Sequence, residues 1–240
     1  MVPLHGAGAC GLEALVRWRH PLRGPVNPVD FIGVAEESGL IVELGRFVLD
    51  SACQQFAAWR RTLGGQAPVS LAVNLSPVQL RRPGLVDDAR RALQRNALEP
   101  DRLQLEVTES LAAQDETARA RLRELKALGV RIALDDFGTG YSSLACLHQL
   151  PVDIVKIDRS FVMHAQTSDY RRVLIEATIR VAQTLGMDTV AEGIEIEGQA
   201  DLMRRLACDC GQGYFWSRPL EVEALGAWLL RQRSPLVLAA

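Results

Sequence analysis

Hydrophobic and polar residues along the chain alternate between two patterns, one typical of buried strands and one typical of amphipathic helices. Short apolar runs predict strands over residues 12–18, 68–74, 103–108, 130–134, 151–158 and 189–191, with a last strand ending at 212–214. Between them, apolar residues recur every three or four positions. This spacing predicts helices over residues 29–38, 41–63, 85–96, 116–128, 170–185, 197–206 and 221–231.

The regular succession of strand and helix predicts an α/β fold, specifically a (β/α)8-type barrel. A length of 240 residues and a hydrophobic content of 48% suit one such barrel. We found no linker, internal repeat or low-complexity segment, so we expect a single domain over residues 1–240. In barrels of this kind the active site lies at the carboxyl ends of the strands.

Polar residues recur at those carboxyl ends. They are Asn74, Glu106, Asp135, Asp136, Lys156, Glu192 and Gln212. Glu106 and Lys156 lie inside otherwise apolar strands, where a charge is costly unless it has a partner of opposite sign or a bound ion. The sequence therefore predicts a charged cluster on one rim of the barrel.

The stretch around Asp135-Asp136 is the most informative in the chain. An apolar run ends at these two adjacent carboxylates, and Gly138 and Gly140 then permit a turn before a helix that we expect from Tyr141 onward. Asp and Gly are also common in plain turns. We favour a metal site, because a divalent cation would relieve the repulsion and takes carboxylate oxygens as ligands.

Two other positions leave alternatives open when read alone. Glu13, Leu15 and Arg17 share one face of the predicted first strand. Glu13 and Arg17 fit either a metal-binding acid beside a phosphate-binding arginine or an ion pair that caps the barrel. Asn74, which precedes Ser76-Pro77, reads by itself as a helix N-cap or turn residue.

Composition and net charge limit the classes of binding partner and the cellular compartments that we expect for this protein. The net charge of −2 provides no basic surface for duplex nucleic acid. We expect no membrane span, because no apolar run is long enough, and no signal peptide. The odd count of five cysteines favours reduced thiols and a cytoplasmic location. Cys208-Asp209-Cys210 lacks zinc-site spacing, so we interpret these cysteines as structural.

Seven motifs together resemble the EAL-type cyclic-di-GMP phosphodiesterase domain, which takes its name from the triplet seen here as Glu13-Ala14-Leu15. The resemblance runs from Gly11 to about Leu220. The motifs, in order, are Glu13-Ala14-Leu15-Val16-Arg17-Trp18, Val73-Asn74-Leu75-Ser76, Leu105-Glu106-Val107-Thr108-Glu109-Ser110, Asp135-Asp136-Phe137-Gly138-Thr139-Gly140-Tyr141, Lys156-Ile157-Asp158-Arg159-Ser160-Phe161, Ala191-Glu192-Gly193-Ile194-Glu195 and Gln212-Gly213-Tyr214. One such motif would be weak, whereas seven in order are specific.

The resemblance implies an enzyme that hydrolyses cyclic-di-GMP to linear pGpG with two Mg²⁺ or Mn²⁺ ions, lowering this second messenger in bacterial signalling. It implies one metal held by Glu13, Asn74, Glu106 and Asp135, and a second held by Asp135, Asp136 and Glu192. Catalytic roles fall to Glu13, Lys156 and Glu192, with Lys156 orienting or activating the attacking water. Arg17, Gln212 and Asp158 would bind or support the substrate. Glu109 and Glu195 would position the loop after the Asp pair, which the family also uses in dimerisation.

The start of the chain departs from the family pattern. Members normally begin with a helix and a strand ending in Tyr-Gln-Pro, whereas here Val2 stands where the Gln would be and the helix and most of the strand are missing. We therefore expect an N-terminally truncated barrel with two unpaired strand edges, which a second copy in a homodimer could cover. The same departure leaves open an alternative function, a weakly active or inactive receptor that binds cyclic-di-GMP.

Overall fold

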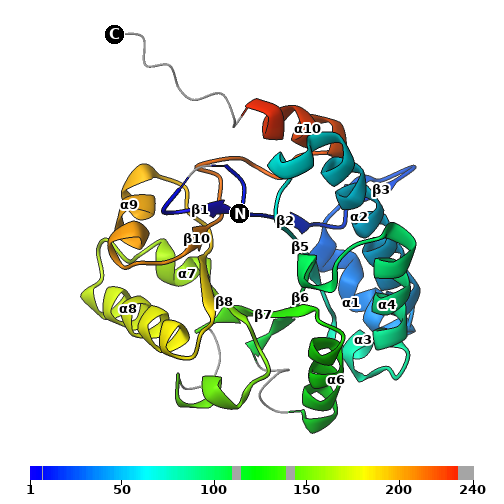
Figure 1. The fold of residues 1–240 in the computed structure, drawn as a ribbon, viewed down its shortest axis with the longest axis horizontal. Helices are drawn as coiled ribbons and strands as arrows, with labels where there is room; N and C mark the ends of the chain where they lie inside the picture. Colours follow the sequence, from blue (N-terminus) through cyan, green and yellow to red (C-terminus); the bar gives the residue numbers. More distant parts are fainter. Residues whose placement is uncertain (7, 110–114, 139–143, 232–240) are drawn as a thin grey trace.

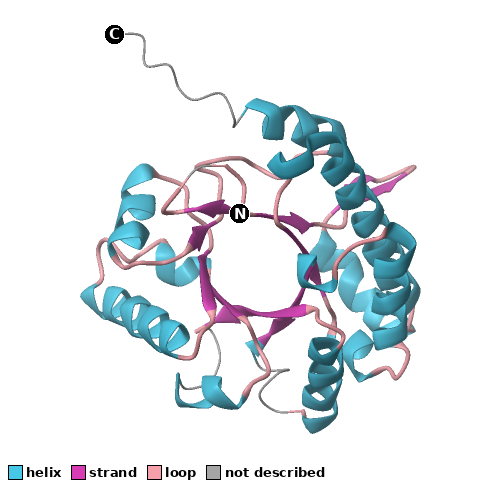
Figure 2. Cartoon of the chain, in the orientation of Figure 1, coloured by secondary structure: helices cyan, strands magenta, loops and turns pink. Residues whose placement is uncertain are grey.

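A computed structural model describes residues 1–6, 8–109, 115–138 and 144–231 of the chain. Within these residues eight strands form one sheet in the order β1-β10-β9-β8-β7-β6-β5-β2, which curves into a ring surrounded by helices (Figures 1 and 2). The strands are β1 (Val2–Pro3), β2 (Gly11–Ala14), β5 (Ser70–Asn74), β6 (Leu103–Thr108), β7 (Arg131–Phe137), β8 (Ile154–Ile157), β9 (Asp188–Ala191) and β10 (Cys210–Gly211). The predicted α/β barrel is confirmed.

Neighbouring strands from β2 round to β10 are parallel, and β1 alone runs antiparallel, against β10. The helices around the ring are α1 (Pro28–Ser38), α2 (Ile41–Leu63), α3 (Pro77–Arg81), α4 (Leu85–Asn96), α6 (Glu116–Ala127), α7 (Arg159–Val162), α8 (Asp169–Thr184), α9 (Glu197–Arg205) and α10 (Val222–Arg231). Short 3₁₀ turns lie at Gly64–Gln66 and Pro100–Arg102. None of the helices in the described ranges has both the length and the apolar character needed to cross a membrane.

Capping residues explain why the first helices begin and end where the pattern predicts. The Asn27 side chain accepts a hydrogen bond from the Val29 N–H at 3.2 Å, and Pro28 supplies the fixed φ that suits a first helical turn. Gly39 ends α1 in the left-handed conformation, with φ of 78°. This conformation favours glycine and separates α1 from α2.

The main hydrophobic core lies between the sheet and the helices packed on it. Leu71, Leu105 and Leu134 from the strands meet Phe56 of α2 and Leu122 of α6, all of them buried. Such residues face outward from the barrel, because successive strand residues point to opposite sides of the sheet. The inward-facing positions are thereby left for the polar residues near the strand ends.

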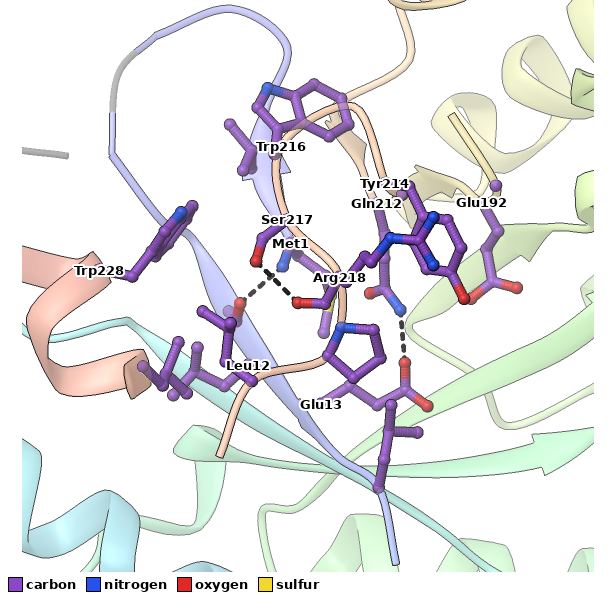
Figure 3. Close-up of a pocket in the computed structure, with 18 of the residues that line it drawn as sticks. Met1, Leu12, Glu13, Glu192, Gln212, Tyr214, Trp216, Ser217, Arg218 and Trp228 are labelled. Atoms are coloured by element: carbon purple, nitrogen blue, oxygen red, sulfur yellow. Dashed lines mark hydrogen bonds between the residues drawn. The ribbon is translucent and has the colours of Figure 1, made fainter. Parts of the chain in front are cut away.

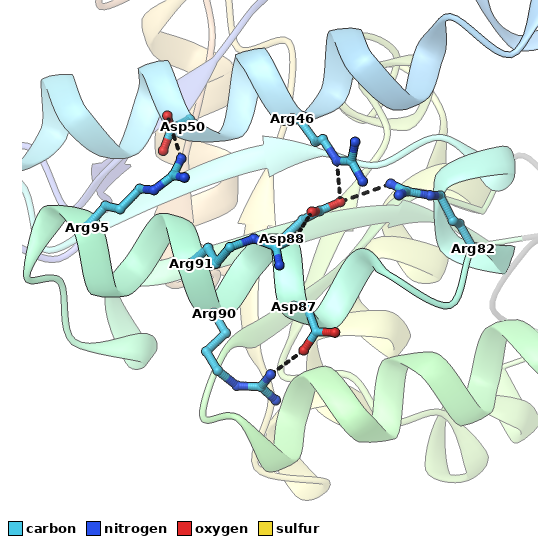
Figure 4. Close-up of polar contacts among 8 residues, drawn as sticks. All are labelled: Arg46, Asp50, Arg82, Asp87, Asp88, Arg90, Arg91 and Arg95. Carbon is cyan, nitrogen blue, oxygen red and sulfur yellow. Dashed lines mark hydrogen bonds and ion pairs between the residues drawn. The ribbon is translucent and has the colours of Figure 1, made fainter.

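An ion-pair network fastens α2 to α4 on the outside of the barrel (Figure 4). The nearly buried Asp88 carboxylate of α4 accepts hydrogen bonds from Arg46 Nε of α2 at 2.8 Å and from Arg82 Nη1 at 3.0 Å, and it also contacts Arg91. Although burial opposes it, these guanidinium groups lower the pKa of Asp88. The network therefore holds a buried charge in place by surrounding it with cations.

The N-terminal segment lies between β10 and β2, at what we call the seam of the barrel. β1 pairs with β10 through Val2 opposite Gly211, and the Leu4 N–H donates to the Asp209 carbonyl at 2.9 Å. On the other side, the Cys10 N–H donates to the Met1 carbonyl at 3.1 Å. The first strand is only two residues long, as expected, but its segment bonds to both flanking strands, so the expected unpaired edges are not observed there.

Three local predictions need correction. No strand was predicted between residues 18 and 29, whereas β3 (Trp18–His20) and β4 (Gly24–Val26) form an antiparallel hairpin there. The first long strand ends at Ala14, so Arg17 does not share a strand face with Glu13. The helix expected from Tyr141 begins outside the described residues, and from Leu144 to Gln149 the chain is a 3₁₀ helix.

Candidate active site

The carboxyl ends of adjacent strands bring the predicted polar residues to one rim. Asn74 of β5 pairs in register with Glu106 of β6, and Thr108 of β6 pairs with Asp135 of β7. Lys156 lies near the end of β8, and Glu192 directly follows β9. Parallel pairing thus brings residues that are spread from Asn74 to Glu192 in the sequence into one cluster.

Lys156 is the centre of this cluster. Its ammonium group lies 2.9 Å from Glu106 Oε1, 3.1 Å from Asp135 Oδ1 and 2.8 Å from Glu192 Oε1. The Lys156 side chain is only 2% exposed, and that of Glu106 is fully buried. A buried ammonium ion is tolerated here because three carboxylates, from β6, from β7 and from the residue after β9, surround it.

Glu13 occupies the seam side of the same rim, at the end of β2. Its Oε1 accepts a hydrogen bond from Asn74 Nδ2 at 2.9 Å, and its Oε2 accepts one from Gln212 Nε2 at 2.5 Å (Figure 3). The two amides reach Glu13 from β5 on one side and from the end of β10 on the other. They fix the direction of the carboxylate without neutralising it.

A β-bulge presents both members of the Asp pair to the site. The pairing of β7 with β8 shifts register between Leu134 and Phe137, and Asp136 takes a left-handed conformation with φ of 54°. In a regular strand, two successive side chains would point to opposite faces. Here carboxylate oxygens of Asp135, Asp136 and Glu192 lie within 4.8 Å of one another.

The residues that follow the bulge are also held by close contacts. The Gly138 N–H donates to Glu109 Oε2 at 2.9 Å, so Glu109 contacts the chain just after the Asp pair. Gly138 has φ of 104°, and a Cβ there would lie 2.7 Å from the Phe161 ring. Residues 139–143 lie outside the described residues. Glu195 is exposed beyond β9 and lines the cleft described next.

A cleft of about 950 Å³ opens over the seam side of the cluster. Glu13, Asp135, Lys156, Glu192 and Gln212 line its floor, as Figure 3 shows for three of them. Its size falls within the range of small-ligand pockets. The cleft therefore gives a molecule of substantial size access to the carboxylates.

The other sequence predictions fall in different places. The exposed Arg17 lines the cleft. Asp158 is buried and caps α7, where one of its carboxylate oxygens accepts from the Ser160 N–H at 2.9 Å. A helix-capping role is thus visible for Asp158, whereas its predicted substrate contact stays a prediction.

The cleft is also lined by residues to which the sequence analysis assigned no role. They are Leu15, Trp18, Arg159, Tyr214, Arg218 and Trp228. Arg218 lies 4.6 Å from the centre of the Tyr214 ring, a cation–π distance. No strand-end pattern marks these residues, although Trp18 and Tyr214 stand inside recognised motifs and are unusually exposed for aromatic side chains.

The cluster contains more acidic side chains than the single ammonium group of Lys156 can neutralise, and the pKa values reflect this. Burial raises the pKa of Glu106 to about 8 and that of Glu192 to about 7. Burial also raises the pKa of Asp136, with a further contribution from Asp135. The surrounding carboxylates hold the pKa of Lys156 well above its usual range despite its burial. Lys156 is therefore charged, and additional positive charge would be favourable.

The residues fit a site for divalent cations. Glu106 Oε2 is completely buried and accepts no hydrogen bond from the described residues, and the Oε1 atom of Gln212 is likewise without a donor. Such unpartnered buried acceptors are costly unless something else binds them. The atoms available as metal ligands are carboxylate and amide oxygens, which Mg²⁺ and Mn²⁺ prefer.

Known proteins are similar to this chain in sequence and in fold. The family model of the EAL domain matches residues 1–219. Among curated proteins, the chain is 45% identical over 216 residues to the bifunctional diguanylate cyclase/cyclic di-GMP phosphodiesterase MucR of Pseudomonas aeruginosa, covering 90% of the chain and 31% of that protein. It is 43% identical to the cyclic di-GMP phosphodiesterase NbdA of the same species, covering 92% of the chain and 28% of that protein. The chain thus spans about a third or less of the length of these relatives.

Solved structures of related proteins have a similar fold. The PaMucR phosphodiesterase in complex with c-di-GMP superimposes with a TM-score of 0.86 at 43% identity, covering 93% of this chain and 90% of that one. The EAL domain of Mycobacterium smegmatis DcpA gives a TM-score of 0.74 at 40% identity, covering 80% of this chain and 86% of that one. With a match to the family model over most of its length and these likenesses, the chain belongs to the EAL domain family.

Proposed function

We propose that this protein is a metal-dependent phosphodiesterase that hydrolyses one phosphodiester bond of cyclic-di-GMP to give linear pGpG. The observation that carries the proposal is the cluster of acidic side chains around Lys156 at the floor of a cleft of about 950 Å³. MucR and NbdA, which are named as cyclic di-GMP phosphodiesterases, support the choice of substrate.

We assign the metal ligands to the carboxylate and amide oxygens of the rim. One divalent ion would be held by Glu13, Asn74, Glu106 and Asp135, and a second by Asp135, Asp136 and Glu192. When bound, Mg²⁺ or Mn²⁺ would lower the pKa of a water molecule and neutralise charge on the reacting phosphate. The shared position of Asp135 agrees with its place beside both Lys156 and the Asp136–Glu192 group.

The protein's own residues supply orientation and charge. Lys156 places a positive charge at the floor of the cleft, where it can hold an attacking water and stabilise negative charge on a phosphate oxygen. Gln212 and Asn74 keep the Glu13 carboxylate directed into the site. Arg17, exposed on the cleft wall, is suited to binding a substrate phosphate through its guanidinium group.

Two supporting roles follow from contacts near the cluster. Glu109 accepts the Gly138 N–H and so holds the chain that follows Asp136, which we propose keeps the bulge in its functional shape. We propose the same kind of role for Glu195 on the cleft wall. Asp158 would act on the substrate indirectly, by fixing the start of α7 beside the site.

Incubation of the purified protein with cyclic-di-GMP and Mg²⁺, followed by chromatography for pGpG, tests the proposal. We expect hydrolysis that stops in EDTA and is lost in Asp135→Asn. The matched control is Asp50→Asn, because Asp50 is a half-exposed aspartate of α2 that is not among the residues lining the cleft and whose carboxylate pairs with Arg95 at 3.6 Å. Undiminished hydrolysis by Asp135→Asn would contradict the metal assignment. Tight binding of cyclic-di-GMP without any pGpG would instead establish the receptor alternative.

We further propose that the protein acts in the cytoplasm and that two copies can associate. Its free cysteines fit a reducing compartment. Sedimentation velocity with and without Mg²⁺ and cyclic-di-GMP measures association directly. A single monomeric species under all of these conditions would contradict the dimer.

A further inference from the structure

Two thiols lie in contact at the seam of the barrel. Cys10 Sγ, just before β2, is 2.9 Å from Cys210 Sγ in β10, although the two residues are 200 positions apart in sequence. Both side chains are half-buried. This separation is far shorter than an ordinary contact between two sulfur atoms, so little movement is needed to bring them to bonding distance.

The third cysteine nearby is placed differently. Cys208 is fully buried and packs with the outer core beside Ala200 and Met203, whereas Cys210 packs inside the barrel near Ala133 and Val190. Cys208 precedes β10 rather than belonging to it, and the two cysteines pack in different hydrophobic clusters. The Cys208 thiol donates a hydrogen bond of 3.4 Å to the Cys210 carbonyl. Of the thiols whose placement the structure describes, Cys10 is the one in position to pair with Cys210.

We propose that Cys10 and Cys210 form a reversible disulfide that closes the barrel seam covalently. The pair lies on the two segments that lead into Glu13 and Gln212, whose side chains are joined by the 2.5 Å hydrogen bond across the same seam. A disulfide would thus place a covalent link three residues before Glu13 and two residues before Gln212. This inference is independent of the proposed hydrolytic activity.

Formation of the bond needs an oxidant, which a small disulfide such as oxidised glutathione supplies. One cysteine thiolate attacks a sulfur of that disulfide, releasing one small thiol and leaving a mixed disulfide on the protein. The second cysteine then attacks the mixed disulfide and releases the other small thiol. Two protein thiols are oxidised and one small disulfide is reduced to two thiols, so atoms and electrons balance. The contact between the thiols lowers the pKa of Cys10, which favours its thiolate as the first nucleophile.

The bond would act mainly on the unfolded chain and on opening of the seam. It joins residues 200 positions apart, so it would remove a large share of the conformational freedom of the unfolded state. In the folded state it would oppose separation of β10 from the N-terminal segment. We therefore expect the oxidised protein to unfold at a Tm higher by roughly 5 °C or more.

The test compares reduced protein with protein equilibrated against oxidised glutathione. Expected are three remaining thiols of the five in the denatured protein, a tryptic fragment linking Cys10 to Cys210, and the raised Tm. Hydrogen exchange should slow in residues 8–14 and 208–213. Cys10→Ser and Cys210→Ser should each abolish the linked fragment and the Tm rise, and dithiothreitol should reverse both. Cys208→Ala is the matched control and should retain them.

Three outcomes would overturn the proposal. One is that the folded protein still has all five thiols after equilibration against oxidised glutathione. Another is a disulfide that joins either cysteine to a different partner. The third is a linked Cys10–Cys210 fragment without any change in Tm or in hydrogen exchange. That result would mean that the disulfide forms only in molecules whose seam has already opened. Because the wild-type protein carries the primary measurements, a folding defect in either serine variant leaves the test intact.

Discussion

Lys156 Nζ lies 2.9 Å from Glu106 Oε1 in the interior of the barrel, with the Glu106 side chain fully buried and that of Lys156 2% exposed. Each of these charges would be very unfavourable alone. Glu106 keeps a second oxygen with no hydrogen-bond donor among the described residues, so this pair is not fully compensated. The second Glu106 oxygen is therefore available to bind a cation, so the role of this pair is not limited to stabilising the fold.

Replacing Lys156 by Met should destabilise the metal-free protein. Removing the ammonium group leaves Glu106, Asp135 and Glu192 facing one another, and breaking a buried ion pair from one side typically costs about 3–5 kcal/mol. We expect a loss of that order in the free energy of unfolding, measured with urea in EDTA.

Lys126→Met is the control for this change. Lys126 pairs with Asp153 at 2.7 Å, but both side chains are partly exposed, so its loss should cost about 1 kcal/mol or less. Equal losses for the two variants would mean that Lys156 is not the counter-charge of the cluster.

Substituting Gly138 by Ala should disturb the bulge that carries the Asp pair. The added Cβ would lie 2.7 Å from the Phe161 ring, in a backbone conformation with φ of 104° that other residues rarely adopt. We expect a loss of about 2–4 kcal/mol in the free energy of unfolding, combining backbone strain and overpacking. Thermal or urea unfolding measures it.

Gly186→Ala separates these two causes. Gly186 also has a positive φ, of 72°, but a Cβ there would meet no atom within 4 Å. Its cost should be backbone strain alone, about 1–2 kcal/mol. A Gly138→Ala variant that is no less stable than Gly186→Ala would show that the Phe161 contact does not constrain the turn.

The metal-free protein should lose stability as pH rises through about 7 to 8. The folded-state pKa values of Glu106 and Glu192, about 8 and about 7, lie above the value of about 4.3 for an unfolded glutamate. From about pH 4.3 up to these folded-state values the folded protein binds more protons than the unfolded chain. The stability from these groups is therefore fully present below about pH 4.3, falls as pH rises, and is lost once pH has passed their folded-state pKa values, so the interval from about 7 to 8 is the end of this decline. We expect a decrease on the order of 1–3 kcal/mol, followed by calorimetry in EDTA.

The stabilisation that added Mg²⁺ provides should increase with pH. Protons compete with the metal for the carboxylates, so the rise in Tm on adding Mg²⁺ should be larger near pH 8.5 than near pH 6. Glu106→Gln is the control, because an amide cannot titrate, and it should make both pH profiles less steep while Glu192 still titrates. A metal-induced Tm rise that is equal at both pH values in the wild-type protein would argue against binding at this cluster.

Asp88→Asn should loosen the packing of α4 on α2. Arg46, Arg82 and Arg91 would lose the carboxylate that they share, and we expect a cost of about 2 kcal/mol in the free energy of unfolding. Asp87→Asn is the neighbouring control, since Asp87 is exposed and pairs with the exposed Arg90 of the same helix. An unchanged urea midpoint for Asp88→Asn would show that the network is not structural.

Much of the fold could be predicted because strands and helices here differ clearly in hydrophobic period. The prediction of a helix over 85–96 and a strand over 103–108 matches α4 and β6 residue for residue. The hairpin of Trp18–His20 with Gly24–Val26 was missed, since it is short, polar and largely exposed and so carries no apolar pattern. The end of β2 at Ala14 was missed as well, because alternation continued for several residues beyond it.

The site could be predicted in composition but not in geometry. Charged residues such as Glu106 and Lys156 inside apolar strands predicted a buried cluster, and the structure brings them together. The bulge that turns both Asp135 and Asp136 toward the site depends on pairing with β8, which no local pattern encodes. The capping of α7 by Asp158 and the contact of Arg218 with Tyr214 are local, between residues two and four positions apart, and the motif-based roles did not include them.

The seam also has a consequence for the order in which the chain folds. Glu13 and its partner Gln212 are separated by 199 positions, and the β1–β10 pairing spans a similar distance. Contacts between residues so remote in sequence form slowly, because a long loop must close before they contribute. During synthesis, strands β2 to β9 can pair with their neighbours as they emerge, whereas the ring must wait for the segment that carries Gln212. We expect the cleft to be the last part of the barrel to acquire its structure, both on the ribosome and on refolding from denaturant.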